Sequence, residues 1–145
     1  MKNKFKIIVL LLWCAIGYGQ KKITWAHLAK VTFADKYFPA YDEYFMYPTF
    51  SESVKALEGT QITITGYFLN IDPEAKLYML SKGPMSACFF CGQGGPETAV
   101  ELQFSKTPKF KTDDIISVTG SLKLNKDNVE HFNYILTGCT ALKLK

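Results

Sequence analysis

Two cysteines at C-x-x-C spacing are the residues of this chain best suited to chemistry. Cys88 and Cys91 lie in a segment, residues 84–97, that is rich in glycine and proline. Thiolates at this spacing can bind a metal ion or exchange disulfides. Strand-like sequences flank the segment, so we expect a long loop over residues 82–97 on a β scaffold. The sequence therefore predicts the place of a site without naming a substrate.

Three uses of the cysteine pair stay open. Cys91 is followed by Gly92, as in one knuckle of a zinc ribbon, and zinc would need one or two further ligands. A thiol-disulfide enzyme could use Cys88 as the nucleophile and Cys91 as the resolving thiol. Such motifs usually begin a helix, which lowers the pKa of the first thiol, and residues 92–96 are a poor helix start. The third interpretation is a structural loop whose cysteines form a disulfide or stay as buried thiols.

The scaffold around this loop is predicted from hydrophobic periodicity. From Gln61 onward apolar and polar residues alternate, as in half-buried strands. Five strands are expected, over residues 61–69, 76–81, 98–104, 115–124 and 131–142. The segment Ile62–Gly66 recurs as Ile116–Gly120, and a glycine inside a strand marks a bend that lets a small barrel close. The expected fold is mainly β, a five-stranded OB-like Greek-key barrel over residues 60–145.

The strand order of such a barrel suggests further ligands for a metal ion. The third and fifth strands are parallel neighbours, so their starts, near Glu97 and His131, should lie close together. The predicted site is therefore a zinc site of Cys88, Cys91, His131 and Glu97. His131 and Glu97 also have ordinary interpretations, as a surface histidine and a strand-start acid. Cys139 falls late on the fifth strand and is expected to be a small core residue.

A second arrangement of the metal site uses two copies of the chain. Each copy would donate Cys88 and Cys91, which gives a four-thiolate site across a two-fold axis in a homodimer. The other histidine, His27, has no partner that the sequence indicates.

Residues 1–19 have the pattern of a signal peptide. Lysines precede a short apolar run from Ile7 to Ile16, and Gly17 and Gly19 stand at −3 and −1 of a cut after Gly19. The apolar run is about half as long as a membrane-spanning helix requires. We therefore expect an exported protein, periplasmic or secreted, with no stable membrane span after cleavage.

Residues 20–59 are expected to form a helical, aromatic-rich extension that packs on the barrel. Thr24 can cap a short helix that carries Trp25 and Leu28, and a second short helix can begin at Ser51 and end at Gly59. Nine aromatic residues lie between Trp25 and Phe50. They are expected to plug one end of the barrel, and the alternative is a stacking platform for sugars or bases.

Charge argues against nucleic acid as a partner. The sequence contains no arginine, the side chain that best contacts phosphates and base edges, and it has no basic patch. Loss of Lys2, Lys4 and Lys6 with the signal peptide would lower the net charge from +4 to +1. No serine with a paired base and no phosphate-binding glycine pattern is present, so an enzyme is less expected than a binding module. The expected partner is an envelope protein or a small ligand.

A set of short motifs adds a resemblance to these inferences. They are Leu57–Gly59, Ile64–Tyr67, Tyr78–Ser81, Ala87–Gly92, Gly95–Glu97 and Val118–Gly120. On these motifs, residues 56–142 resemble a family of exported bacterial OB-like proteins of unknown function. The resemblance implies the fold and supplies no reaction. A broader group has a cysteine at the position of Cys88 and a histidine two residues later, where this chain has Phe90, so only Cys88 carries over a ligand role.

Overall fold

The computed structural model describes residues 19–87, 92 and 94–145. Most of the predicted signal peptide, and Cys88 and Cys91, lie outside these residues. The described chain is mainly β. None of the helices in the described ranges is long and apolar enough to cross a membrane.

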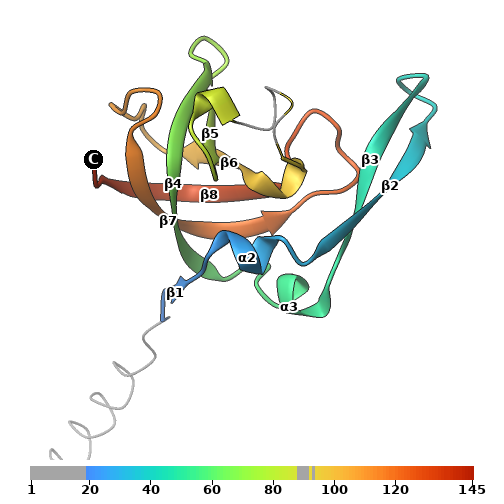
Figure 1. Ribbon diagram of the computed structural model, residues 1–145, viewed down its shortest axis with the longest axis horizontal. Helices are drawn as coiled ribbons and strands as arrows, with labels where there is room; N and C mark the ends of the chain where they lie inside the picture. The colour runs from blue at the N-terminus through green and yellow to red at the C-terminus, as the bar shows by residue number, and fades with distance from the viewer. Residues whose placement is uncertain (1–18, 88–91, 93) are drawn as a thin grey trace, which may run out of the picture.

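Five strands form a closed barrel, as the hydrophobic alternation predicted. They are β4 (Gln61–Asp72), β5 (Leu77–Ser81), β6 (Ala99–Phe104), β7 (Ile115–Leu124) and β8 (Tyr134–Lys143). Their order is β4-β5-β6-β8-β7, and β7 pairs with β4 to close the barrel (Figure 1). β6 and β8 are parallel, whereas the other neighbours in the barrel are antiparallel.

The two glycine-ended segments noticed in the sequence pair with each other at the closure. Ile62 of β4 lies opposite Gly120 of β7, and Gly66 lies opposite Ile116. A Cβ on Gly66 would stand 2.6 Å from the carbonyl oxygen of Ser81 and 2.9 Å from Trp25. Only glycine allows this approach, so Gly66 lets β4 bend tightly against β5.

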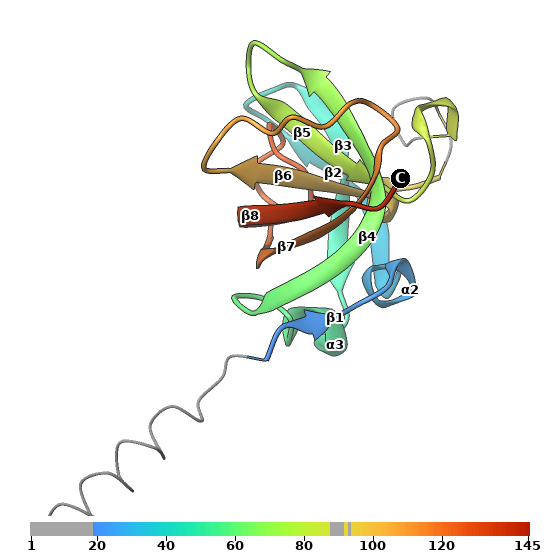
Figure 2. The ribbon, with the colours of Figure 1, turned by 90° about the vertical axis from the view of Figure 1, so that its left-hand side faces the viewer.

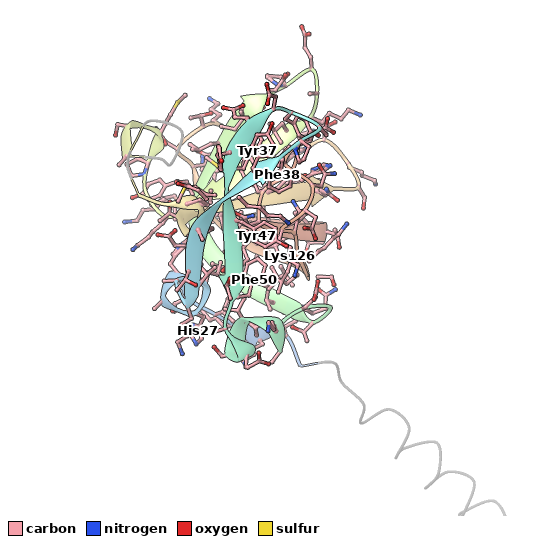
Figure 3. All side chains as sticks on the ribbon, turned by 90° about the vertical axis from the view of Figure 1, so that its right-hand side faces the viewer. His27, Tyr37, Phe38, Tyr47, Phe50 and Lys126 are labelled. Carbon is pink, nitrogen blue, oxygen red and sulfur yellow. The ribbon has the colours of Figure 1, made fainter. Side chains whose placement is uncertain are left out.

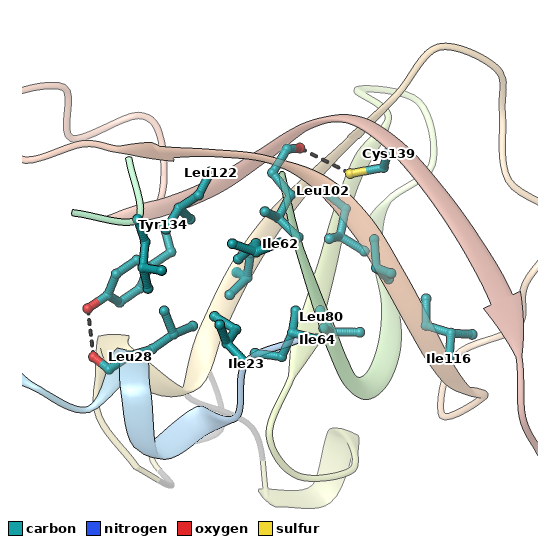
Figure 4. Packing of buried hydrophobic residues seen from close by; sticks show 14 of the residues in the cluster. Ile23, Leu28, Ile62, Ile64, Leu80, Leu102, Ile116, Leu122, Tyr134 and Cys139 are labelled. Atoms are coloured by element: carbon teal, nitrogen blue, oxygen red, sulfur yellow. Dashed lines mark hydrogen bonds between the residues drawn. The ribbon is translucent and has the colours of Figure 1, made fainter. Parts of the chain in front are cut away.

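The barrel interior is one apolar cluster that residues before β4 complete. Alternate residues of each strand point inward, among them Ile62 and Ile64 of β4 and Ile116 and Val118 of β7 (Figure 4). The N-terminal segment adds Ile23, Leu28, Val54 and Leu57, all buried in the same cluster. The core is therefore formed jointly by the barrel and by residues that precede it.

The N-terminal segment lies across one end of the barrel. β1 (Lys21–Lys22) runs parallel to the start of β4, and α2 (Trp25–Leu28) and α3 (Glu52–Lys55) lie at the same end (Figure 2). Trp25 donates its indole N–H to the carbonyl of Thr65 at 2.9 Å. Tyr134 donates its buried hydroxyl to the carbonyl of Leu28 at 2.6 Å (Figure 4). These two hydrogen bonds fix α2 on the barrel.

The aromatic-rich part of the extension is a hairpin, which the sequence analysis did not predict. β2 (Val31–Phe38) and β3 (Glu43–Phe50) form a separate two-stranded sheet, here called the arm, which extends along the side of the barrel (Figure 1). The expectation that the nine aromatic rings plug the barrel is wrong for most of them. Phe50 is buried against Tyr134, while the rings farther along the arm pack on one another or are exposed. Strand pairing within the arm places those rings outside the barrel.

The loop before β8 is also longer than predicted. Residues 125–133 are not strand, so β8 begins at Tyr134 rather than at His131. The side-chain amide of Asn125 explains this, because it donates to the carbonyls of Asn128, His131 and Phe132. The backbone is thereby folded onto one side chain instead of entering the sheet.

The cysteine loop has the short 3-10 turns Met85–Ala87 and Pro96–Thr98 at its two ends.

Replacing Tyr134 by phenylalanine should destabilise the fold by about 1–3 kcal/mol, because the buried carbonyl of Leu28 would lose its donor. Urea denaturation of the purified protein measures this difference. Tyr41→Phe, at an exposed ring of the arm, is the matched control and should change the free energy of unfolding little. Equal effects of the two substitutions would contradict the importance of this hydrogen bond.

Candidate functional site

A buried carboxylate on the outer face of the barrel holds one of the predicted site residues. Glu101, in the middle of β6, has a side chain only 5% exposed. Both of its oxygens lie within hydrogen-bond distance of Nδ1 of His131, at 2.9 and 3.0 Å. The carboxylate also accepts from the backbone N–H of Phe132 at 3.2 Å and from the side-chain amide of Gln103 at 2.9 Å. Hydrogen bonds from three donors therefore offset the free-energy cost of burying the Glu101 carboxylate.

This pairing fixes the orientation of the His131 ring. Since Nδ1 is engaged by Glu101, Nε2 points away from the carboxylate and is the nitrogen that can meet a ligand or a metal ion. The His131 side chain is 43% exposed, so a ligand can reach it. A buried carboxylate behind a half-exposed imidazole is the arrangement that orients histidines in many binding and metal sites.

Sequence reasoning expected His131 beside Glu97 at the start of the third strand, and it did not name Glu101, with which the structure pairs His131. The parallel pairing of β6 with β8 brings the two regions together, as expected. A signal for Glu101 was present, because Val100 and Leu102 face the core and an acid between them must lie on the outer face. What the sequence could not show is that the outer face is itself covered at this point.

The outer face is covered by a second, smaller apolar cluster. Leu69, Met79 and Ala99 are buried outside the barrel, and Phe132 packs on them. This contact holds the 125–133 loop against β4, β5 and β6. Glu101 and His131 therefore meet beneath a loop that is fixed by packing and by the hydrogen bonds of Asn125.

A groove of about 560 Å³ runs between the arm and this outer wall of the barrel. Its lining is mainly apolar, and His131 forms part of it. The arm contributes Phe38, Tyr44, Phe45 and Met46, and the barrel side contributes Ile71, Leu77, Pro96 and Ala99. The remaining lining comes from the 125–133 loop. This size and composition are typical of sites for small molecules.

Contacts between the arm and the 125–133 loop form one border of the groove. Tyr47 donates its hydroxyl to Asp127 at 3.0 Å, and Lys36 lies 3.7 Å from the same carboxylate. The ammonium of Lys36 also sits over the Tyr47 ring, 3.9 Å from its centroid, with Lys126 on the same ring at 5.9 Å (Figure 3). Lys36 and Asp127 are exposed, so each contact contributes modestly to stability, but together they join the middle of the arm to the loop.

The other predicted site residues lie apart from the Glu101–His131 pair or outside the described residues. Glu97 lies on the turn Pro96–Thr98, which contacts α2. The pKa of Tyr134 is raised by burial and, secondarily, by the charge of Glu97. In the described ranges, no three His, Cys, Asp or Glu side chains are close enough to hold a metal ion. The predicted zinc site therefore depends on Cys88 and Cys91, of which the structure says nothing.

The two remaining residues singled out in the sequence have structural roles. Cys139 is buried in the core, as predicted, and donates its thiol to the carbonyl of Leu136 at 3.1 Å (Figure 4). Burial raises the pKa of this thiol to about 11. His27 caps α2: its Nδ1 accepts from the backbone N–H of Thr24 at 3.1 Å.

A scan against protein-family models and searches of the curated proteins and of the solved structures found no match to this chain. The function is therefore inferred from the geometry of the groove and of the Glu101–His131 pair.

Glu101→Gln should destabilise the protein by about 1–3 kcal/mol and free the His131 ring, because an amide cannot accept from all three donors. Urea denaturation gives the first effect, and the ¹⁵N shifts of the imidazole give the second. The chain has only two histidines, so His27 serves as an internal reference. Glu97→Gln is the matched control. An unchanged His131 tautomer in Glu101→Gln would contradict the orienting role of Glu101.

Cys139 should resist alkylation by iodoacetamide at pH 8 in the folded protein, since its thiol is buried and its raised pKa leaves almost no thiolate. Mass spectrometry of a Cys88→Ser/Cys91→Ser variant without the signal peptide measures this thiol alone. The same variant in urea should be labelled within the assay time. Fast labelling of the folded form would show that the core around Cys139 opens readily.

Proposed function

We propose that this protein is an exported binding module on an OB-type Greek-key barrel and that the groove beside the arm is its ligand site. The strand order supports the OB assignment. Its first and fourth strands, β4 and β7, are antiparallel neighbours, and its third and fifth, β6 and β8, are parallel. Export is inferred from the signal-peptide pattern of residues 1–19, with cleavage after Gly19.

The position of the groove agrees with this assignment. OB folds bind ligands on the face of strands two and three and through the loops between strands one and two and strands four and five. Here the groove borders the end of β4 at Ile71, the start of β5 at Leu77, the start of β6 at Ala99, and the 125–133 loop. The arm adds a wall that the five strands alone would not have.

The observation that carries the proposal is the Glu101–His131 pair. A carboxylate that is nearly fully buried is costly unless its partners are held in place, and here it sets the direction of one exposed ring at the groove. A ring oriented in this way is suited to recognition, because the His131 side chain is still 43% exposed.

The same ring is the third ligand of the zinc site that we propose for the cysteine loop. Cys88 and Cys91 would supply two thiolates and His131 its Nε2, with Glu97 as the candidate fourth ligand. Glu101 would then act as the carboxylate behind a metal-binding histidine, which raises ligand basicity and fixes the ring. A zinc ion there would tie the loop to the wall of the groove. Pro96 lines the same groove as His131, whereas Glu97 lies apart from the Glu101–His131 pair, so its carboxylate would have to move to reach a metal ion on His131.

Metal analysis of purified protein without residues 1–19 should find about one zinc per chain, and the Cys88→Ser/Cys91→Ser variant should lose it. Glu101→Gln should weaken zinc binding by about 10–100-fold, as expected for the partner of a ligating histidine. Glu97→Gln shows whether Glu97 is a ligand.

Other outcomes of the same experiment would favour the alternatives. One zinc per two chains with a dimer in solution would favour four thiolates shared by two copies. No stoichiometric metal and an unreactive disulfide would leave a structural loop. Turnover in an insulin-reduction assay would make the protein a thiol-disulfide enzyme.

A further inference from the structure

We infer that the groove between the arm and the barrel binds a small, uncharged, apolar molecule that carries a hydroxyl group, with the hydroxyl at Nε2 of His131. The inference rests on the proposed function only in taking the groove as the ligand site. It applies to the protein without zinc, because a zinc ion on Nε2 would leave no lone pair for the hydroxyl.

Exposed apolar side chains in the groove indicate the body of this ligand. Met46 of the arm is 48% exposed and Ile71 of β4 is 36% exposed, and both line the groove. Tyr44 is the third such side chain and is 67% exposed. Exposed apolar groups that converge on one concave surface are typical of a ligand site, since a bound molecule removes them from water. A flat or branched hydrocarbon body would cover all three.

The charges around the groove argue against an ionic ligand. Among the residues that line it, Lys126 and Glu130 carry opposite charges on the same loop. Behind His131 lies the carboxylate of Glu101, 2.9 Å from Nδ1. An anion at His131 would be repelled by this carboxylate. For an organic cation, the groove lining offers the carboxylate of Glu130, with Lys126 on the same loop. A charged group would also lose solvation in a mainly apolar groove without a fixed partner.

A hydroxyl is the polar group that suits the nitrogen of His131 left free by Glu101. With Nδ1 donating to Glu101, Nε2 is the nitrogen that can accept a hydrogen bond. A hydroxyl can donate that bond and is uncharged. Because His131 lines the groove, the hydroxyl end of an apolar molecule would lie against the 125–133 loop.

The probe is 2-naphthol, which has two fused aromatic rings and a hydroxyl that stays protonated at pH 7. It is titrated into the protein in the presence of EDTA, so that zinc does not contribute. We expect saturable shifts of the His131 imidazole signals in NMR spectra, with the His27 signals unchanged. The anion 2-naphthoate should bind at least about tenfold more weakly than 2-naphthol, from the lost solvation and the repulsion by Glu101.

Paired variants test the location. Met46→Thr combined with Ile71→Thr removes apolar surface from both walls and keeps residues suited to strands. It should weaken 2-naphthol binding about tenfold. Leu142→Thr makes the same change at a residue of β8 that is 73% exposed and is not part of the groove lining. This control should bind within about twofold of the unmodified protein.

Three results would overturn the inference: equal affinity for 2-naphthol and 2-naphthoate, equal shifts at His27 and His131, or unchanged affinity in the double variant. These results are distinct from failure of the zinc proposal. A protein that holds zinc but fails to bind 2-naphthol in EDTA refutes this inference alone. A protein that binds 2-naphthol but holds no zinc refutes only the metal site.

Discussion

Closure of the barrel between β4 and β7 is the constraint on which the rest of this structure depends. Gly66 lets β4 pass close to β5, and Gly120 lets β7 pass close to β8. The paired segments from Gln61 to Tyr67 and from Ile115 to Ser121 then complete the ring. Once the ring is closed, alternate apolar residues fill its interior. The groove lies on the outside of the barrel, where additional segments create a second surface.

That second surface is built by two segments with different supports. The arm is a two-stranded hairpin, a structure that is marginally stable alone. Its base is held in the core by Phe50, and its middle is held to the 125–133 loop through Tyr47 and Asp127. The loop is held by the hydrogen bonds of Asn125 and by the packing of Phe132. The groove lies between these supports, and its width depends on contacts that are individually modest.

The Glu101–His131 pair connects the barrel to this groove. Glu101 is fixed by its place in β6, so its position follows from the register of the sheet. His131 lies on a loop that the sheet alone would not position, and the buried carboxylate compensates by holding Nδ1. The rigid strand β6 thus sets the direction of the His131 side chain on the less regular 125–133 loop, which is a common way to orient a binding group.

The sequence by itself determined the barrel. The period-two alternation from Gln61 onward, the recurring glycine-ended segment and the turn residues gave the five strands, because inward and outward faces are encoded locally in each strand. The predicted topology also gave the proximity of His131 to the start of β6 and the burial of Cys139.

Only the tertiary structure shows that the aromatic-rich segment forms the arm, that His131 pairs with Glu101, and that a groove lies between the arm and the barrel. Aromatic residues between Val31 and Phe50 suit a plug or a hairpin equally well, and which form they take depends on where the neighbouring barrel leaves room for them. The alternation along β6 puts Glu101 on the outer face, between the core residues Val100 and Leu102. Only the docked 125–133 loop buries that position, and because this loop is distant from β6 in sequence, no local pattern predicts the contact.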